Sequence, residues 1–64
     1  MKTVKIDFED LKINQVIMYM GYQVMITKII DITKVYGVVR NGNYSGQNVR
    51  IHGDSQERYN LIQY

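Results

Sequence analysis

Apolar and polar side chains alternate along most of the chain, in runs that are short for helices. Val4, Ile6 and Phe8 alternate with Lys5 and Asp7, a period of two that is typical of a strand with one buried face. Nineteen residues are Ile, Val or Thr, six are Tyr and none is Ala, which favours strands over helices. Further strand-like runs cover residues 16–20, 23–30, 33–40, 47–52 and 59–64. The pattern predicts an all-β domain of five or six short strands.

Polar and glycine-containing segments separate these runs. Residues 9–14 break the alternation and predict a turn, and Gly21-Tyr22 predicts another. Asn41-Gly42 is the sharpest local signal, because both central positions of a type I′ turn need φ > 0; the polar residues 43–46 that follow leave a longer loop open. Before the last strand we expect a single 3₁₀ turn at residues 55–58, since a nine-residue helix over 54–62 would be marginal.

The order of these elements resembles the SH3-like small barrels, including the Tudor and KOW-type domains. Residues 11–19 (LKINQVIMY) and 21–26 (GYQVMI) are similar to the L-x-x-G-x-x-V…G-x-x-x-x-I opening of such barrels, with Asn14 where many of them have glycine. The resemblance covers about residues 10 to 64. It implies a small SH3-like barrel of five or six strands with one 3₁₀ turn before the last strand. No aromatic cage or KOW motif can be assigned, so no site residues carry over.

Length and composition indicate one small domain over residues 1–64. The chain lacks cysteine, so neither disulfides nor thiolate metal sites are expected. Its apolar runs are too short to span a bilayer, and no apolar segment of a signal peptide follows the N-terminus; we expect a soluble, cytoplasmic protein with no membrane contact. Ile, Asn, Tyr and Lys make up 25 of the 64 residues, a bias that fits an AT-rich bacterium, a phage or a mobile element.

Catalytic and metal chemistry find little support in the sequence. His52 is the only histidine, so a nucleophile–base pair would have to combine it with Ser45 or Ser55, and a barrel of this size has little room for the surrounding pocket. The acidic residues between positions 7 and 10 are too few for the six to eight oxygen ligands of Ca²⁺. We therefore predict no enzymatic activity, no metal or other cofactor and no small-molecule substrate.

Charge is distributed unevenly along the chain. Residues 11–53 hold five Lys or Arg against Asp31 alone, within a total net charge of +2. Cations interleaved with tyrosines suit single-stranded nucleic acid, because cations bind phosphates and aromatic rings stack on bases. The predicted nucleic-acid-binding residues are Lys34, Tyr36, Arg40, Tyr44, Arg50 and His52. Alternatively, the tyrosines are half-buried strand residues and the cations only face solvent.

The chain is also richer in apolar residues than one small barrel interior requires. Methionine-rich apolar surface adapts readily to protein partners, so homodimerisation or docking on a larger protein would bury the excess. The predicted interface residues are Met18, Met20, Met25 and Ile29. Alternatively, the N-terminal strand and the C-terminal segment cover both faces of these strands.

These features favour a non-catalytic accessory protein of a phage or bacterial mobile element. We expect it to bind nucleic acid, preferably single-stranded, while docked on a replication enzyme or another nucleic-acid enzyme. The alternative is a protein-binding module, such as an inhibitor of a host protein, that acts through the apolar Met/Ile surface without touching nucleic acid. Salt distinguishes them, because nucleic-acid binding weakens steeply with ionic strength.

Overall fold

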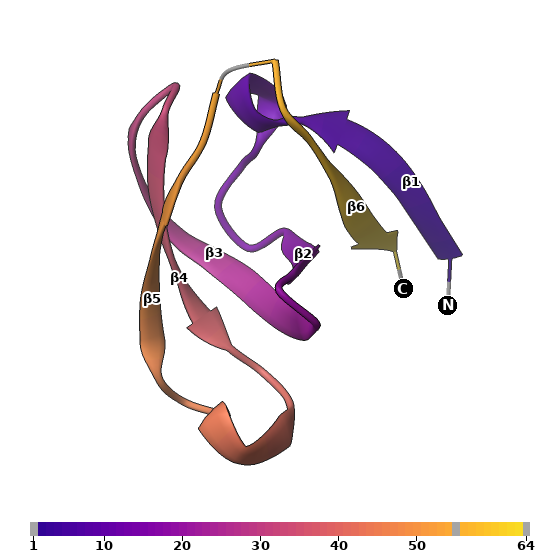
Figure 1. Cartoon of the computed structure of the whole chain (residues 1–64), viewed down its shortest axis with the longest axis vertical. Coiled ribbons are helices and arrows are strands. Elements are labelled where there is room, and N and C mark those ends of the chain that lie inside the picture. The colour runs from indigo at the N-terminus through magenta and orange to yellow at the C-terminus, as the bar shows by residue number, and fades with distance from the viewer. Residues whose placement is uncertain (1, 55, 64) are drawn as a thin grey trace.

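The computed structural model describes residues 2–54 and 56–63 as a single six-stranded antiparallel sheet (Figure 1). Its elements are β1 (Lys2–Asp7), η1 (Phe8–Asp10), β2 (Val16–Tyr19), β3 (Tyr22–Asp31), β4 (Lys34–Val39), η2 (Gly42–Tyr44), β5 (Asn48–His52) and β6 (Arg58–Gln63). The strand order is β1-β6-β2-β3-β4-β5. The predicted all-β class is confirmed, and the described residues form no helix apart from the 3₁₀ turns η1 and η2.

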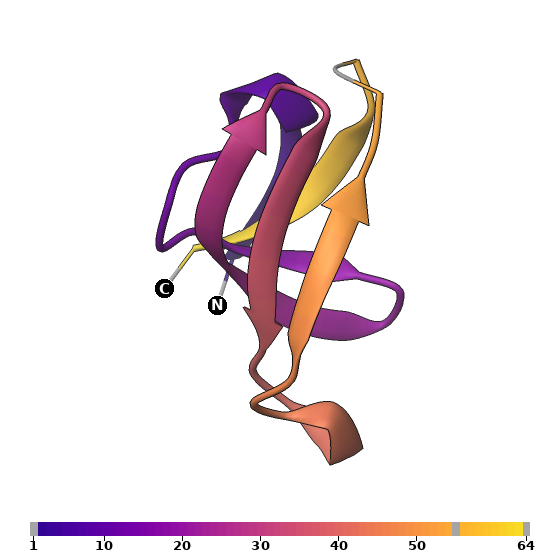
Figure 2. The same ribbon diagram turned by 90° about the vertical axis from the view of Figure 1, so that its left-hand side faces the viewer.

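The sheet folds over itself to make a small barrel. Strands β2 to β5 follow one another as neighbours, and β6 returns to pair with β2 through Val16–Ile62 and Ile17–Leu61. Figures 1 and 2 show that β3, β4 and β5 form one layer, with β1 and β6 in the other. No ladder joins β1 to β5 within residues 2–54 and 56–63, so the barrel is open along these two edge strands.

The core lies between the two layers and draws on nearly every element. Ile17 of β2, Ile26 of β3 and Ile51 of β5 are fully excluded from solvent. Phe8 of η1 and Val35 of β4 pack into the same cluster. Buried and exposed positions alternate along β4 and β5, as the apolar pattern predicts. One face of each of these strands is therefore committed to the core, and the other is left free for contacts.

Asn14 adopts a backbone conformation that glycine adopts most easily. Its φ is 75°, in the left-handed region that asparagine tolerates better than most residues. Its backbone N–H donates to the carbonyl of Ile26 over 2.8 Å. Asparagine can therefore serve here in place of glycine and link the segment before β2 to β3.

The type I′ turn lies between β2 and β3 and not at Asn41-Gly42. Met20 and Gly21 both have positive φ, 50° and 84°, and form the two-residue connection that a type I′ turn requires. Asn41 is extended, with φ −142°, because its side-chain oxygen accepts a hydrogen bond from the backbone of Gln23. The prediction at Asn41-Gly42 is therefore wrong, and the longer loop that residues 43–46 left open is the observed connection.

The segment before β6 also differs from the prediction. Among the described residues the 3₁₀ turns lie at residues 8–10 and 42–44, and neither lies directly before β6. The backbone N–H of Glu57 donates to the carbonyl of Asp54 over 2.9 Å, so a single turn hydrogen bond stands where the 3₁₀ element was expected. Ser55 in that segment, and Tyr64 at the expected end of the last strand, lie outside the described residues.

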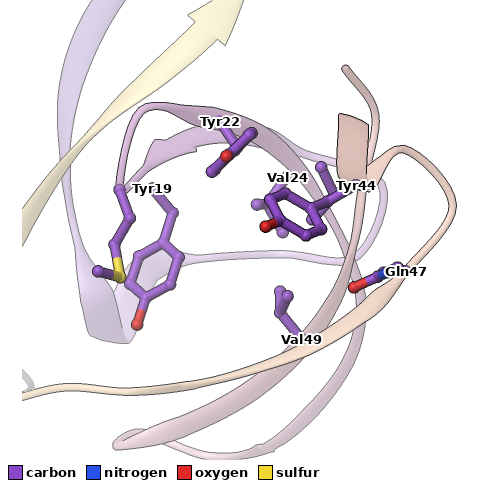
Figure 3. A pocket seen from close by; sticks show the side chains of 8 residues that line it. Tyr19, Tyr22, Val24, Tyr44, Gln47 and Val49 are labelled. Atoms are coloured by element: carbon purple, nitrogen blue, oxygen red, sulfur yellow. The ribbon is translucent and has the colours of Figure 1, made fainter. Parts of the chain in front are cut away.

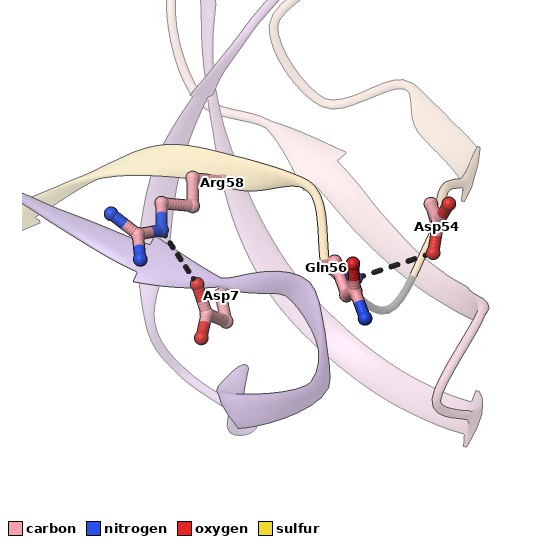
Figure 4. A network of polar contacts seen from close by, with 4 residues as sticks. All are labelled: Asp7, Asp54, Gln56 and Arg58. Atoms are coloured by element: carbon pink, nitrogen blue, oxygen red, sulfur yellow. Dashed lines mark hydrogen bonds and ion pairs between the residues drawn. The ribbon is translucent and has the colours of Figure 1, made fainter.

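An ion pair links the ends of β1 and β6. Arg58 donates from Nε to Oδ1 of Asp7 over 3.0 Å, and Gln56 donates from its backbone to Asp54 (Figure 4). Because both partners of the ion pair are exposed, it stabilises the fold by at most about 1 kcal/mol.

Among the described residues no helix is long and apolar enough to cross a membrane.

Gly37 of β4 packs closely against Val24 and Met25 of β3, and replacing it should destabilise the fold. A Cβ at Gly37 would lie 2.5 Å from Val24 Cγ1 and 2.8 Å from the carbonyl oxygen of Met25, and the ladder holds that carbonyl in place. Gly37→Ala should lower the free energy of unfolding in urea by about 1–3 kcal/mol. The exposed Asn48→Ala should change it by less than about 0.5 kcal/mol. Equal stability of the two variants would contradict this packing.

Candidate nucleic-acid interface and an aromatic pocket

Strands β4 and β5 bring four of the predicted nucleic-acid-binding residues together. In the antiparallel register Lys34 lies opposite His52, and Tyr36 lies opposite Arg50. Their chain neighbours point into the core, with Val35 only 1% exposed. The side chains of the four predicted residues therefore share the outer face of the sheet.

A third strand adds a cation that the sequence pattern missed. Lys28 of β3 lies opposite Tyr36, because the register shifts between Ile26 and Lys28. Strict alternation from Ile26 would have turned Lys28 toward the core, and a bulge cannot be located from the pattern alone. Neighbouring strands lie about 5 Å apart, so Lys28 and Arg50 flank Tyr36 on either side. We call these three residues the cationic row.

An acidic residue, Asp31, lies at the end of β3 beside this surface. It lies opposite Lys34 in the register. The side-chain hydroxyl and the backbone N–H of Thr33 both donate to its Oδ1 over 2.7 Å. These hydrogen bonds, with a smaller effect of the Lys34 charge, lower the pKa of the Asp31 carboxyl below its usual 3.8. Lys34 therefore faces a carboxylate, and positive charge is concentrated on the cationic row.

The other two predicted nucleic-acid-binding residues lie elsewhere. Arg40 directly follows β4, four residues after Tyr36. Its Nη1 donates a hydrogen bond to the sulfur of Met25 over 3.7 Å. Tyr44 belongs to η2 and packs edge-on against Tyr22, with ring centroids 5.5 Å apart at 83°. The six predicted residues thus divide among the β4–β5 face, the end of β4 and the η2 segment.

The predicted apolar interface is also divided. Met25 lies opposite Val16, and Met18 lies opposite Gln23, so the two methionines are diagonal neighbours on one face. Met20 lies in the β2–β3 turn and is 80% exposed. Ile29 lies near the far end of β3, opposite Val35, and is partly exposed. Only Met18 and Met25 therefore form a shared surface.

A pocket of about 280 Å³ opens at one end of the barrel (Figure 3). It is lined by Tyr19, Met20, Tyr22, Val24, Val39, Tyr44, Gln47 and Val49. Apart from Tyr44 and Met20, these residues were not singled out by the sequence pattern. One signal was present, because a two-residue turn places Tyr19 and Tyr22 directly opposite each other, with both rings on one side of the hairpin.

Backbone hydrogen bonds hold the η2 segment over Tyr22. The N–H of Gly46 donates to the carbonyl of Val39 over 2.7 Å, and that of Gln47 donates to the carbonyl of Tyr44 over 3.0 Å. Gly42 has a φ of +74°, and a Cβ on it would lie 3.2 Å from the ring of Tyr22. A glycine is thus needed at position 42 for both its backbone conformation and its close approach. The η2 segment, held by its own backbone hydrogen bonds, therefore forms the wall of the pocket that carries Tyr44.

Tyr59 packs against Tyr19, the lining residue on the other side of the pocket from Tyr44. Its ring lies 6.1 Å from that of Tyr19 and 5.7 Å from that of Phe8, and its hydroxyl donates to Oε2 of Glu57 over 3.1 Å. Burial, followed by the hydrogen bond to Glu57 and the negative charge of that residue, raises the pKa of Tyr59 to about 12. The neutral phenol is the form that fits this site.

The candidates for catalysis and metal binding do not converge. His52 ends β5, whereas Ser45 precedes the start of that strand; Ser55 lies outside the described residues. Within the part of the chain that the structure describes, no three His, Cys, Asp or Glu side chains are grouped to hold a metal ion.

The raised pKa of Tyr59 predicts a specific loss of stability at high pH. Unfolded tyrosine loses its proton near pH 10, whereas folded Tyr59 keeps it until about pH 12, so rising pH in this window favours the unfolded chain. Below pH 10 the effect is absent. The free energy of unfolding, measured in urea, should fall more steeply between pH 10 and 12 for the wild type than for Tyr59→Phe. Tyr44→Phe should keep the wild-type slope, and parallel curves for wild type and Tyr59→Phe would disprove the assignment.

Comparisons with protein-family models, with curated proteins and with solved structures found no match to this chain. A small barrel by itself supports many unrelated functions. The function therefore has to follow from the cationic row and the pocket.

Proposed function

We propose that the outer face of β3, β4 and β5 binds single-stranded nucleic acid. The observation that carries the proposal is the cationic row, in which Lys28 and Arg50 flank the ring of Tyr36 across three strands. Basic groups on either side of an aromatic ring match the alternation of phosphate and base along a single strand. Lys34 and His52 lie beside the row at the next outward-facing pair of β4 and β5 and extend the same surface.

The charges of the row are available for phosphates. Among residues 2–54 and 56–63 one ion pair is formed, between Arg58 of β6 and Asp7 of β1. Lys28 and Arg50 therefore have no salt-bridge partner within the described part of the chain. Binding phosphates there would release condensed counterions, which supplies most of the affinity of sequence-independent nucleic-acid binding.

Single strands fit this face better than duplexes. A base in a duplex is stacked between its neighbours, whereas an unpaired base offers its face to a ring such as Tyr36. Duplex recognition usually inserts a helix or a two-stranded ribbon into a groove, and the cationic row lies instead along the face of a sheet. We therefore assign Tyr36 a stacking role and Lys28 and Arg50 phosphate contacts.

A protein-binding role through Met18 and Met25 is the second candidate. The observation that favours it is their diagonal placement on the outer face, with Arg40 laid over Met25. Ile30 near the end of β3 and Ile32 in the turn to β4 add exposed apolar side chains at a distance along the sheet. Docking of a phage or mobile-element accessory protein on a nucleic-acid enzyme through Met18 and Met25 would be compatible with the cationic row, since the two surfaces use different residues.

Removing both cations of the row should weaken binding of single-stranded DNA and reduce its salt dependence. For a fluorescein-labelled thymidine strand of about 15 nucleotides, Lys28→Ala/Arg50→Ala should make the slope of log K against log salt shallower by about 1.4, or about 0.7 for each lost phosphate contact. Fluorescence anisotropy between about 50 and about 200 mM salt measures that slope.

The double variant Lys2→Ala/Lys5→Ala is the matched control. It removes the same charge from the edge strand β1 and should keep most of the affinity and the wild-type slope. Equal losses in the two double variants would show that net charge, and not the cationic row, determines binding. Salt-insensitive or absent binding by the wild type would exclude the proposal and leave the Met18–Met25 surface as the candidate.

A further inference from the structure

We infer that the aromatic pocket accepts one unpaired nucleobase of a strand bound on the cationic row; this inference rests on the proposed function. The pocket lies at the end of the barrel, whereas the row lies on its outer face. The row would hold phosphates and stack one base on Tyr36, and the pocket would take a second base. Five features of the pocket support this assignment.

The walls of the pocket suit a flat, uncharged ring system. Tyr19, Tyr22 and Tyr44 contribute aromatic rings, and none of the lining residues is charged. Tyr19 and Tyr44 lie on opposite sides of the space in Figure 3. A charged group would lose its hydration there without gaining a partner. A nucleobase is uncharged, and the charged phosphate of its nucleotide can stay outside the pocket.

Polar atoms are few and are carried by residues that can serve either as donors or as acceptors. The tyrosine hydroxyls and the amide of Gln47 provide both kinds of group. Binding sites for small rings typically combine apolar walls with a small number of such groups. A purely aliphatic ligand would leave them unused, so a heterocycle with a hydrogen-bonding edge fits the lining better.

The volume of about 280 Å³ limits the size of the ligand. Pockets for drug-sized molecules cover about 300–1,000 Å³, so this pocket is at the small end of that range. One base fits such a volume, whereas a run of stacked bases does not. The rest of the strand must therefore remain outside the pocket.

Strand β5 connects the pocket to the cationic row. Val49 lines the pocket, and the next residue, Arg50, lies opposite Tyr36 on the outer face. Consecutive Cα atoms are about 3.8 Å apart, and β5 is an edge strand with no further strand beyond it among the described residues. A nucleic-acid strand can therefore cross this edge from the row to the pocket without passing over another element.

The pocket is also organised in advance. Tyr44 stays half-exposed but is held edge-on against Tyr22 by the hydrogen-bonded η2 segment. Side chains that are fixed before binding lose less conformational entropy when a ligand arrives. Tyr44 is therefore the residue whose ring should contribute most directly to binding a base.

A pair of strands with and without bases tests this inference. Two fluorescein-labelled strands of about 15 nucleotides are compared by anisotropy: one of thymidine, and one of abasic sites with the same phosphates. Tyr44→Leu keeps an apolar side chain but removes the ring. It should weaken binding of the thymidine strand by about 5- to 150-fold, the range expected for one stacked base, and leave binding of the abasic strand unchanged.

Control variants separate the pocket from the outer face and from the fold. Because Tyr36 also offers a ring, the comparison is repeated in a Tyr36→Leu background, where the effect of Tyr44→Leu should persist. Thermal melting checks that Tyr44→Leu is folded, and Tyr22→Leu provides a second variant of the same pocket.

The possible outcomes distinguish the inference from the proposed function. If Tyr44→Leu and Tyr22→Leu leave binding of the thymidine strand unchanged, or weaken both strands equally, the pocket does not hold a base, although salt-sensitive binding of the abasic strand would still support the cationic row. If the wild type binds neither strand, the proposed function and the inference both fail.

Discussion

Ile17, Ile26 and Ile51 lie on three different strands, and each is completely excluded from water. A chain of 64 residues without cysteine has no disulfide, and its described residues form no helix layer that could cover the sheet. The two halves of the sheet must therefore cover each other. Gly37 makes this closure tight, because no side chain separates β4 from Val24 at that point. Val24, which packs against Gly37, also lines the pocket, so this close packing reaches from the core to the candidate site.

The same strands serve the core and the candidate binding surface. Since side chains alternate across a strand, burying Val35 and Ile51 places Lys34, Tyr36 and Arg50 outside. At the end of the barrel the core side chains no longer fill the space between the two layers. There Val49 lines the pocket together with Tyr44. Neighbouring residues of the edge strand β5 thus belong to the cationic row (Arg50) and to the pocket (Val49), which is why we propose a single ligand strand as the occupant of both.

Much of the fold could be predicted from the sequence, because strand formation here follows local alternation. The strand ranges and the alternation of buried and exposed side chains along them have local causes. The type I′ turn was misplaced because the Asn41 side chain bonds to distant Gln23. Lys28 was missed because a bulge moved it to the outer face. The pocket was missed because its walls come from segments that meet only after folding.

An amide chemical-shift titration of the labelled protein with a single-stranded thymidine oligonucleotide tests the central claim most directly. The claim is that nucleic acid binds the outer face of β3, β4 and β5. We predict the largest shifts around Lys28, Tyr36 and Arg50, with shifts that shrink as salt is added. An absence of shifts at low salt, or shifts confined to β1 and β6, would contradict it.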